Sequence, residues 1–165
     1  MRQIDEVCIA KSINFINAIP AEEKMDYWAN IRQRQPHACL TAIDMVQEGV
    51  SVSKFGHAIY LLMVMHHAFY SNCRYLPLIT QDMLREALEG NVAMLQTMKR
   101  GWLAHDKAIL LYPERTMLTF FICYAKGNNL AIPCKENEIL LTRIKIVLDA
   151  YVKAKDIAAN NIKLH

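Results

Sequence analysis

Residues 53–73 read SKFGHAIYLLMVMHHAFYSNC, and this stretch decides the fold class. At helical spacing it forms a stripe of mostly apolar side chains, whose flank is also apolar or aromatic. The stripe is Phe55, Ile59, Leu62, His66, Phe69 and Cys73, and the flank is Tyr60, Met63, Val64 and Tyr70. A helix that is apolar on nearly every side has to be covered by its neighbours, so we expect residues 53–73 to form the buried central helix of a bundle.

Helix start and stop signals divide the rest of the chain into further helices. Pro20 and Pro113 are each followed by glutamate, as at the first turn of a helix, and Pro36 is a further start. Gly49 and residues 127–129 are typical of helix ends, because Gly and Asn tolerate the left-handed conformation. The predicted helices are 3–18, 21–34, 37–48, 53–73, 80–100, 113–126 and 135–160, with a short turn around 102–112. The sequence therefore predicts an all-α, single-domain bundle of about seven helices over residues 1–165.

Composition and cysteine usage indicate a cytoplasmic protein. The chain of 165 residues suits one domain, and its five cysteines are scattered without a C-x-x-C pair, as in proteins of a reducing compartment. The N-terminal segment MRQIDEVC carries acids where a secretory signal needs an apolar run. The longest apolar stretch, 58–69, is shorter than the roughly 20 residues that span a membrane. We therefore expect no membrane association. Because nucleotide-binding motifs are missing, we also expect no cofactor.

The last predicted helix carries charges of alternating sign along one face. Lys145, Asp149 and Lys153 follow one another at a spacing of four residues, and Asp156 comes next. Such a pattern is typical of a solvated helix face with salt bridges. We therefore expect this face to lie in water; the alternative is a nucleic-acid-binding patch.

A metal site is one interpretation of the histidines. His66 lies in the central helix, and the pair His105-Asp106 lies between two later helices. Imidazole and carboxylate are normal ligands of divalent metals. The spacing resembles that of the metal-dependent HD phosphohydrolases, which implies a hydrolase site of His66, His105 and Asp106 with Asp149 or Asp156 as the last ligand. Otherwise His66 is a core histidine that hydrogen-bonds a backbone or hydroxyl group. Adjacent histidines point about 100° apart on a helix, so we expect only one of His66 and His67 to face a shared site.

A ribonuclease site is a second interpretation. Arg100 and His105 stand five residues apart at the end of a long predicted helix. This Arg–His pair resembles the HEPN ribonucleases, small all-α bundles whose site usually forms across a dimer. The resemblance implies RNA as a partner, with His105 as the proton-transfer group and Arg100 on the phosphate. A histidine can exchange protons with the ribose hydroxyl, and an arginine can stabilise the phosphate charge.

The leading hypothesis is a helical protein-interaction or regulatory module that binds another protein or a second copy of itself as a homodimer. Catalytic motifs are weak, while several predicted helices are rich in aromatic and methionine side chains that could leave an apolar face uncovered. The residues expected at such an interface are Tyr27, Trp28, Ile31, Phe120 and Tyr124.

Overall fold

The computed structural model describes residues 3–73, 75–97 and 109–163. Its helices in this part of the chain are α1 Glu6–Ala18, α2 Ala21–Arg34, α3 Pro36–Gln47, α4 Val52–Asn72, α5 Gln81–Thr97, α7 Arg115–Gly127 and α8 Lys135–Lys163. The described residues contain no strand. The prediction of an all-α bundle is therefore confirmed, and the predicted ranges lie within a few residues of the observed helices.

Local sequence signals set the helix ends. Pro36 is the first residue of α3, where its missing N–H costs nothing. Gly49 follows α3 with a φ of 96°, and Asn129 follows α7 with a φ of 60°. Both residues stand in the left-handed region, which Gly and Asn tolerate best. Before α5, the hydroxyl of Thr80 accepts a hydrogen bond from the N–H of Met83 at 3.2 Å, as expected of a capping residue.

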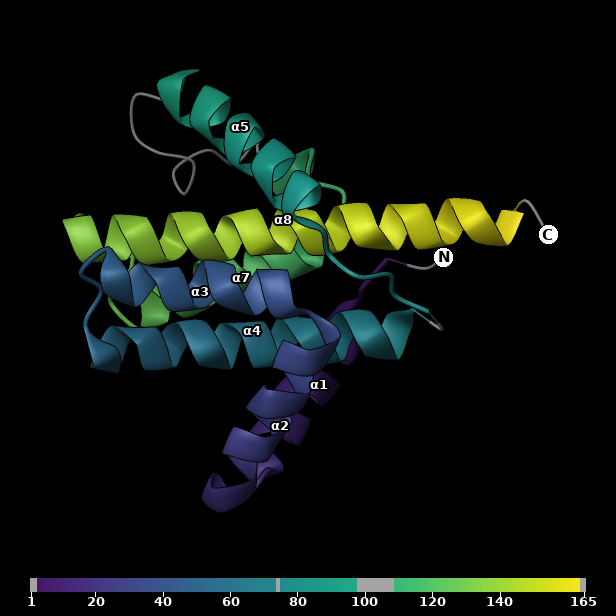
Figure 1. The fold of residues 1–165 in the computed structure, drawn as a ribbon, viewed down its shortest axis with the longest axis horizontal. Helices are drawn as coiled ribbons and strands as arrows, with labels where there is room; N and C mark the ends of the chain where they lie inside the picture. The colour runs from purple at the N-terminus through teal and green to yellow at the C-terminus, as the bar shows by residue number, and fades with distance from the viewer. Residues whose placement is uncertain (1–2, 74, 98–108, 164–165) are drawn as a thin grey trace.

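The helices form a central group with projections on two sides (Figure 1). The helices α3, α4 and α8 all pack on one another, and α7 lies behind them in this view. The helix α1 packs on α4, and α2 packs on both α3 and α4, so that α1 and α2 extend away below the central group. On the opposite side, α5 packs against α8.

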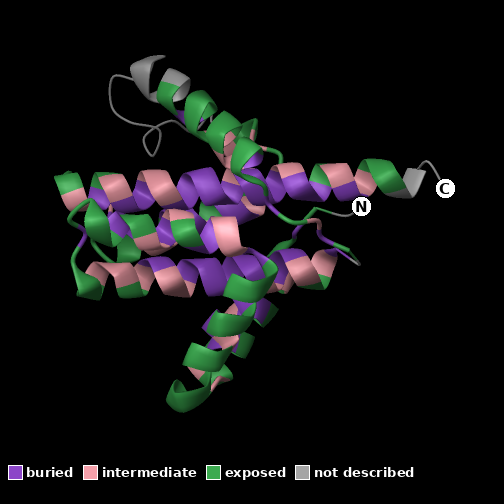
Figure 2. Cartoon of the chain, viewed as in Figure 1, coloured by how far each residue is buried: buried purple, intermediate pink, exposed green. Residues whose placement is uncertain are grey.

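The core lies where α4 and α8 face each other and their neighbours (Figure 2). Phe69 of α4 and Tyr151 of α8 are fully buried, and their rings stack with centroids 5.1 Å apart. Buried residues of α4 run from Ala58 to Phe69, which confirms the expectation of a buried helix at 53–73. The longer α8 shares the centre with it, because α8 packs against α3, α4 and α5.

The charged face of α8 is solvated only in part: Lys153 and Asp156 are partly or fully exposed, as expected from the sequence, whereas Lys145 and Asp149 are largely covered. Lys145 and Asp149 form the expected i, i+4 ion pair, but their side chains are only 7% and 21% exposed. Asp149 also accepts hydrogen bonds from Asn91 of α5 (2.6 Å) and from the hydroxyl of Tyr112 (2.5 Å). Because α5 covers this part of α8, a charge pattern typical of a surface lies instead in a helix–helix contact.

A buried ion pair fixes the N-terminal segment. Glu114, directly before α7, and Lys155 of α8 form this pair, and both side chains are 5% exposed. The same carboxylate accepts the backbone N–H of Ile4 at 2.9 Å, and the Gln3 side chain donates to the carbonyl of Pro113 at 3.0 Å. Glu114 makes no side-chain cap on α7. Its role is therefore to join the start of the chain to α7 and α8.

Candidate functional site

The two catalytic hypotheses fall largely outside the described part of the chain. Arg100, His105 and Asp106 all lie outside the described residues. Within those residues, no group of three His, Cys, Asp or Glu side chains could hold a metal ion. His66, the remaining member of the metal hypothesis, is 3% exposed, and its Nδ1 lies 2.9 Å from the hydroxyl of Tyr151. This contact matches the alternative expectation of a core histidine bonded to a hydroxyl.

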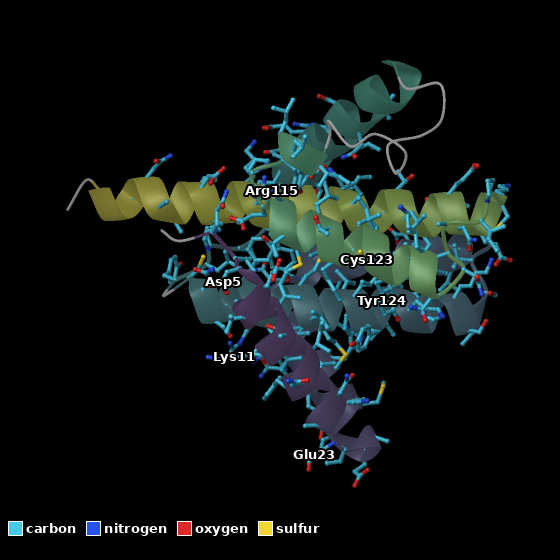
Figure 3. The ribbon with its side chains drawn as sticks, turned by 180° about the vertical axis from the view of Figure 1, so that it is seen from behind. Asp5, Lys11, Glu23, Arg115, Cys123 and Tyr124 are labelled. Atoms are coloured by element: carbon cyan, nitrogen blue, oxygen red, sulfur yellow. The ribbon has the colours of Figure 1, made fainter. Side chains whose placement is uncertain are left out.

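The residues expected at an interface have different surroundings. Trp28 and Ile31 are 6% and 1% exposed, so they belong to the core rather than to a surface. Phe120 and Tyr124 of α7 are half-buried, and Tyr124, labelled in Figure 3, stacks on Tyr60 of α4 at 5.2 Å. Tyr27 is half-buried and lines an open groove. The periodicity of α2 did not distinguish Tyr27 from its buried neighbour Trp28.

A groove of about 990 Å³ lies between the end of α1, the length of α2 and the second half of α4. Its lining combines aromatic rings, two imidazoles and charges of both signs. The lining residues are Phe15, Ala18, Ile19, Pro20, Glu23, Asp26, Tyr27, Asn30, Arg34, His66, His67, Tyr70 and Ser71. Figure 3 shows Glu23 at the far tip of the α1–α2 projection, which is one end of this groove.

The aromatic rings of the groove pack against one another. Phe15 of α1 stacks on the ring of His67 with centroids 4.2 Å apart, and meets Tyr27 of α2 edge to face at 5.7 Å. The rings of His66 and Tyr70 on α4 are 4.2 Å apart. Phe15 is 43% exposed although it is aromatic. Three helices thus contribute to an apolar wall that stays accessible.

His66, which lines the groove, has a tautomer that its hydrogen bond defines. In the described part of the chain, the buried hydroxyl of Tyr151 has Nδ1 of His66 as its hydrogen-bonding contact. A buried hydroxyl without an acceptor is costly, so Tyr151 donates to Nδ1 and the proton of the neutral imidazole lies on Nε2. Burial, together with Arg34 and His67, lowers the pKa of His66 to about 3, so the ring is neutral at physiological pH. Its Nε2–H makes no hydrogen bond to a described residue.

His67 has the opposite tautomer. The Ser12 hydroxyl donates its proton to the carbonyl of Cys8 at 2.9 Å. Its oxygen can therefore only accept a hydrogen bond from His67. Nδ1 of His67, 2.9 Å from that oxygen, must therefore carry the proton; the Ser71 hydroxyl is farther away, at 3.5 Å. Burial lowers the pKa of His67, which keeps Nε2 as an acceptor. The groove thus combines one donor and one acceptor imidazole.

Both histidines line this one groove, although neighbouring side chains on a helix point about 100° apart. The groove is wide enough to contact two neighbouring faces of α4. His66 lies at its buried floor, while His67 is half-buried and stacks on Phe15. An angle of about 100° between neighbouring side chains therefore does not separate them here.

Arg34 ends α2 at the basic end of the groove. Its guanidinium lies over the ring of Tyr70, 5.5 Å from the centroid, and forms no ion pair with a carboxylate of the described residues. The next residue, the buried Gln35, fixes this region, because its amide accepts the N–H of Ile79 at 2.7 Å and donates to the carbonyl of Pro77 at 3.1 Å. Gln35 thus anchors the end of α2, and the Arg34 guanidinium beside Tyr70 keeps a charge that no carboxylate of the described residues neutralises.

No protein-family model, curated protein or solved structure matches this chain. Within the described part of the chain, no helix has the length and apolar character needed to cross a membrane.

Proposed function

We propose that this chain is a helical protein-interaction module and that the groove between α1, α2 and α4 is its docking site. The observation that carries the proposal is this groove of about 990 Å³, with the exposed ring of Phe15 and the half-buried rings of Tyr27 and Tyr70 along its wall. Grooves between helices are a common way to receive a segment of another protein. The groove also offers Tyr27, Tyr70 and Arg34, and tyrosine and arginine are enriched among the residues that dominate binding energy.

A cytoplasmic location forms part of the proposal. Cys123 and Cys134 are exposed thiols. Exposed thiols persist in a reducing compartment. The partner is a different protein or, as a homodimer, a second copy of the chain, and the mass of the complex distinguishes these two outcomes.

The proposal is tested by substituting an exposed aromatic residue of the groove. A charge at Phe15, which stacks on His67, would face the apolar wall and weaken docking. We expect Phe15→Glu to lower retention of the partner, measured by native mass spectrometry of protein purified from its own cells, at least about tenfold.

The matched control is Tyr75→Glu, because Tyr75 is an aromatic residue that is 74% exposed and lies outside the groove. We expect this variant to retain the partner as the unchanged protein does. Equal retention by Phe15→Glu, or recovery of the unchanged protein without any second polypeptide, would contradict a docking role for the groove.

A further inference from the structure

The groove has an acidic end and a basic end. Asp26 and Glu23 lie near the start of α2, and Arg34 is its last residue. Eight residues separate Asp26 from Arg34, which corresponds to about 12 Å along a helix that rises 1.5 Å per residue. None of these three side chains forms an ion pair with a described residue, so both ends keep their charge for a ligand.

The basic end suits a carboxylate. Arg34 supplies N–H donors in a planar fork, and Nε2–H of His66 supplies one more from the floor of the groove. The positive charge of Arg34 acts on the groove, because it helps burial to lower the pKa of His66. A bound carboxylate would neutralise this charge and receive a neutral donor at the same time.

We propose that the groove binds a segment of a different protein that carries an acidic side chain for Arg34 and His66, a basic side chain for Asp26, and an aromatic side chain between them. This inference rests on the proposed docking function of the groove. About 12 Å corresponds to about four residues of an extended chain, which rises roughly 3.3 Å per residue. The aromatic side chain then lies against Phe15 and Tyr27. A polyanion such as RNA fits poorly, because Asp26 and Glu23 repel it.

The test uses synthetic peptides and the full chain. Two probes carry the charges in opposite order, acetyl-Asp-Ala-Phe-Ala-Lys-amide and acetyl-Lys-Ala-Phe-Ala-Asp-amide, and the third, acetyl-Asn-Ala-Phe-Ala-Gln-amide, is uncharged. Binding is followed by NMR through the side-chain signals of His66 and Tyr70. We expect one charged peptide to bind at least about tenfold more tightly than the uncharged one, as for a charge-assisted pair.

Variants assign the difference to Arg34. We expect Arg34→Gln to abolish the preference for the charged peptide, whereas Arg32→Gln should keep it, because Arg32 is exposed on α2 but lines a different pocket. If the charged and uncharged peptides bind with equal affinity, or if Arg34→Gln keeps the preference for the charged peptide, the charge inference is wrong. Neither result contradicts the docking function of the groove. If no peptide moves the signals of His66 and Tyr70, both proposals are overturned.

Discussion

Lys155→Ala is expected to lower the free energy of unfolding by about 3–5 kcal/mol, the usual cost of breaking a buried ion pair from one side. Lys155 and Glu114 are both 5% exposed, so the substitution leaves a buried carboxylate without its cation. That carboxylate also accepts the N–H of Ile4, so the N-terminal segment should loosen as well. Urea unfolding followed by circular dichroism measures the change.

The control for this prediction is an exposed ion pair of the same chain. Arg85 and Asp82 on α5 are 68% and 73% exposed, and such pairs contribute about 0–1 kcal/mol. We expect Arg85→Ala to change the free energy of unfolding by no more than that. A Lys155→Ala variant as stable as Arg85→Ala would show that Glu114 and Lys155 do not form a buried pair.

The second large effect is a loss of stability in mild acid caused by His66. Its pKa is about 3 in the folded chain and near 6.5 when the chain is unfolded. The unfolded state therefore binds the extra proton first. The contribution of His66 to the free energy of unfolding is constant above about pH 6.5. Below that value the free energy of unfolding falls as the pH drops toward 3. Between pH 7.5 and pH 5, His66 should cost about 2 kcal/mol, at 1.36 kcal/mol for each pH unit below 6.5.

His66→Gln isolates this contribution. Glutamine does not titrate, and its side-chain oxygen can accept the hydrogen bond from Tyr151. The contribution of His67, whose pKa is also lowered by burial, is present in both proteins and cancels in the comparison. The unchanged protein should lose about 2 kcal/mol more than His66→Gln between the two pH values. The same pH dependence in both proteins would mean that His66 is not buried in its neutral form.

Much of the fold could be predicted from the sequence, because its signals are local. The apolar stretch around Leu62 and Phe69 indicated a buried helix, and Gly49 and Asn129 marked helix ends through their tolerance of positive φ. Such signals depend on neighbouring residues alone. They do not show how helices pack against one another. The central position of α8, and the contact of α5 with Asp149, were therefore evident only from the structure.

The groove could not be predicted for the same reason. Phe15, Arg34 and Tyr70 come from α1, α2 and α4, and nothing in their spacing along the chain brings them together. The sequence offered His66 as a metal ligand or a core histidine, but its tautomer follows from Tyr151, 85 residues further along. The only interface residue predicted from sequence that lines the groove is Tyr27.

The most direct test of the docking groove is site-specific photocrosslinking in the protein's own cells. A photoreactive phenylalanine analogue is placed either at Tyr27, which lines the groove, or at Tyr75, which is exposed outside it. We predict a crosslinked partner chain from position 27 and none from position 75. Crosslinking from position 75 without crosslinking from position 27 would contradict the account, because the docking surface would then lie outside the groove.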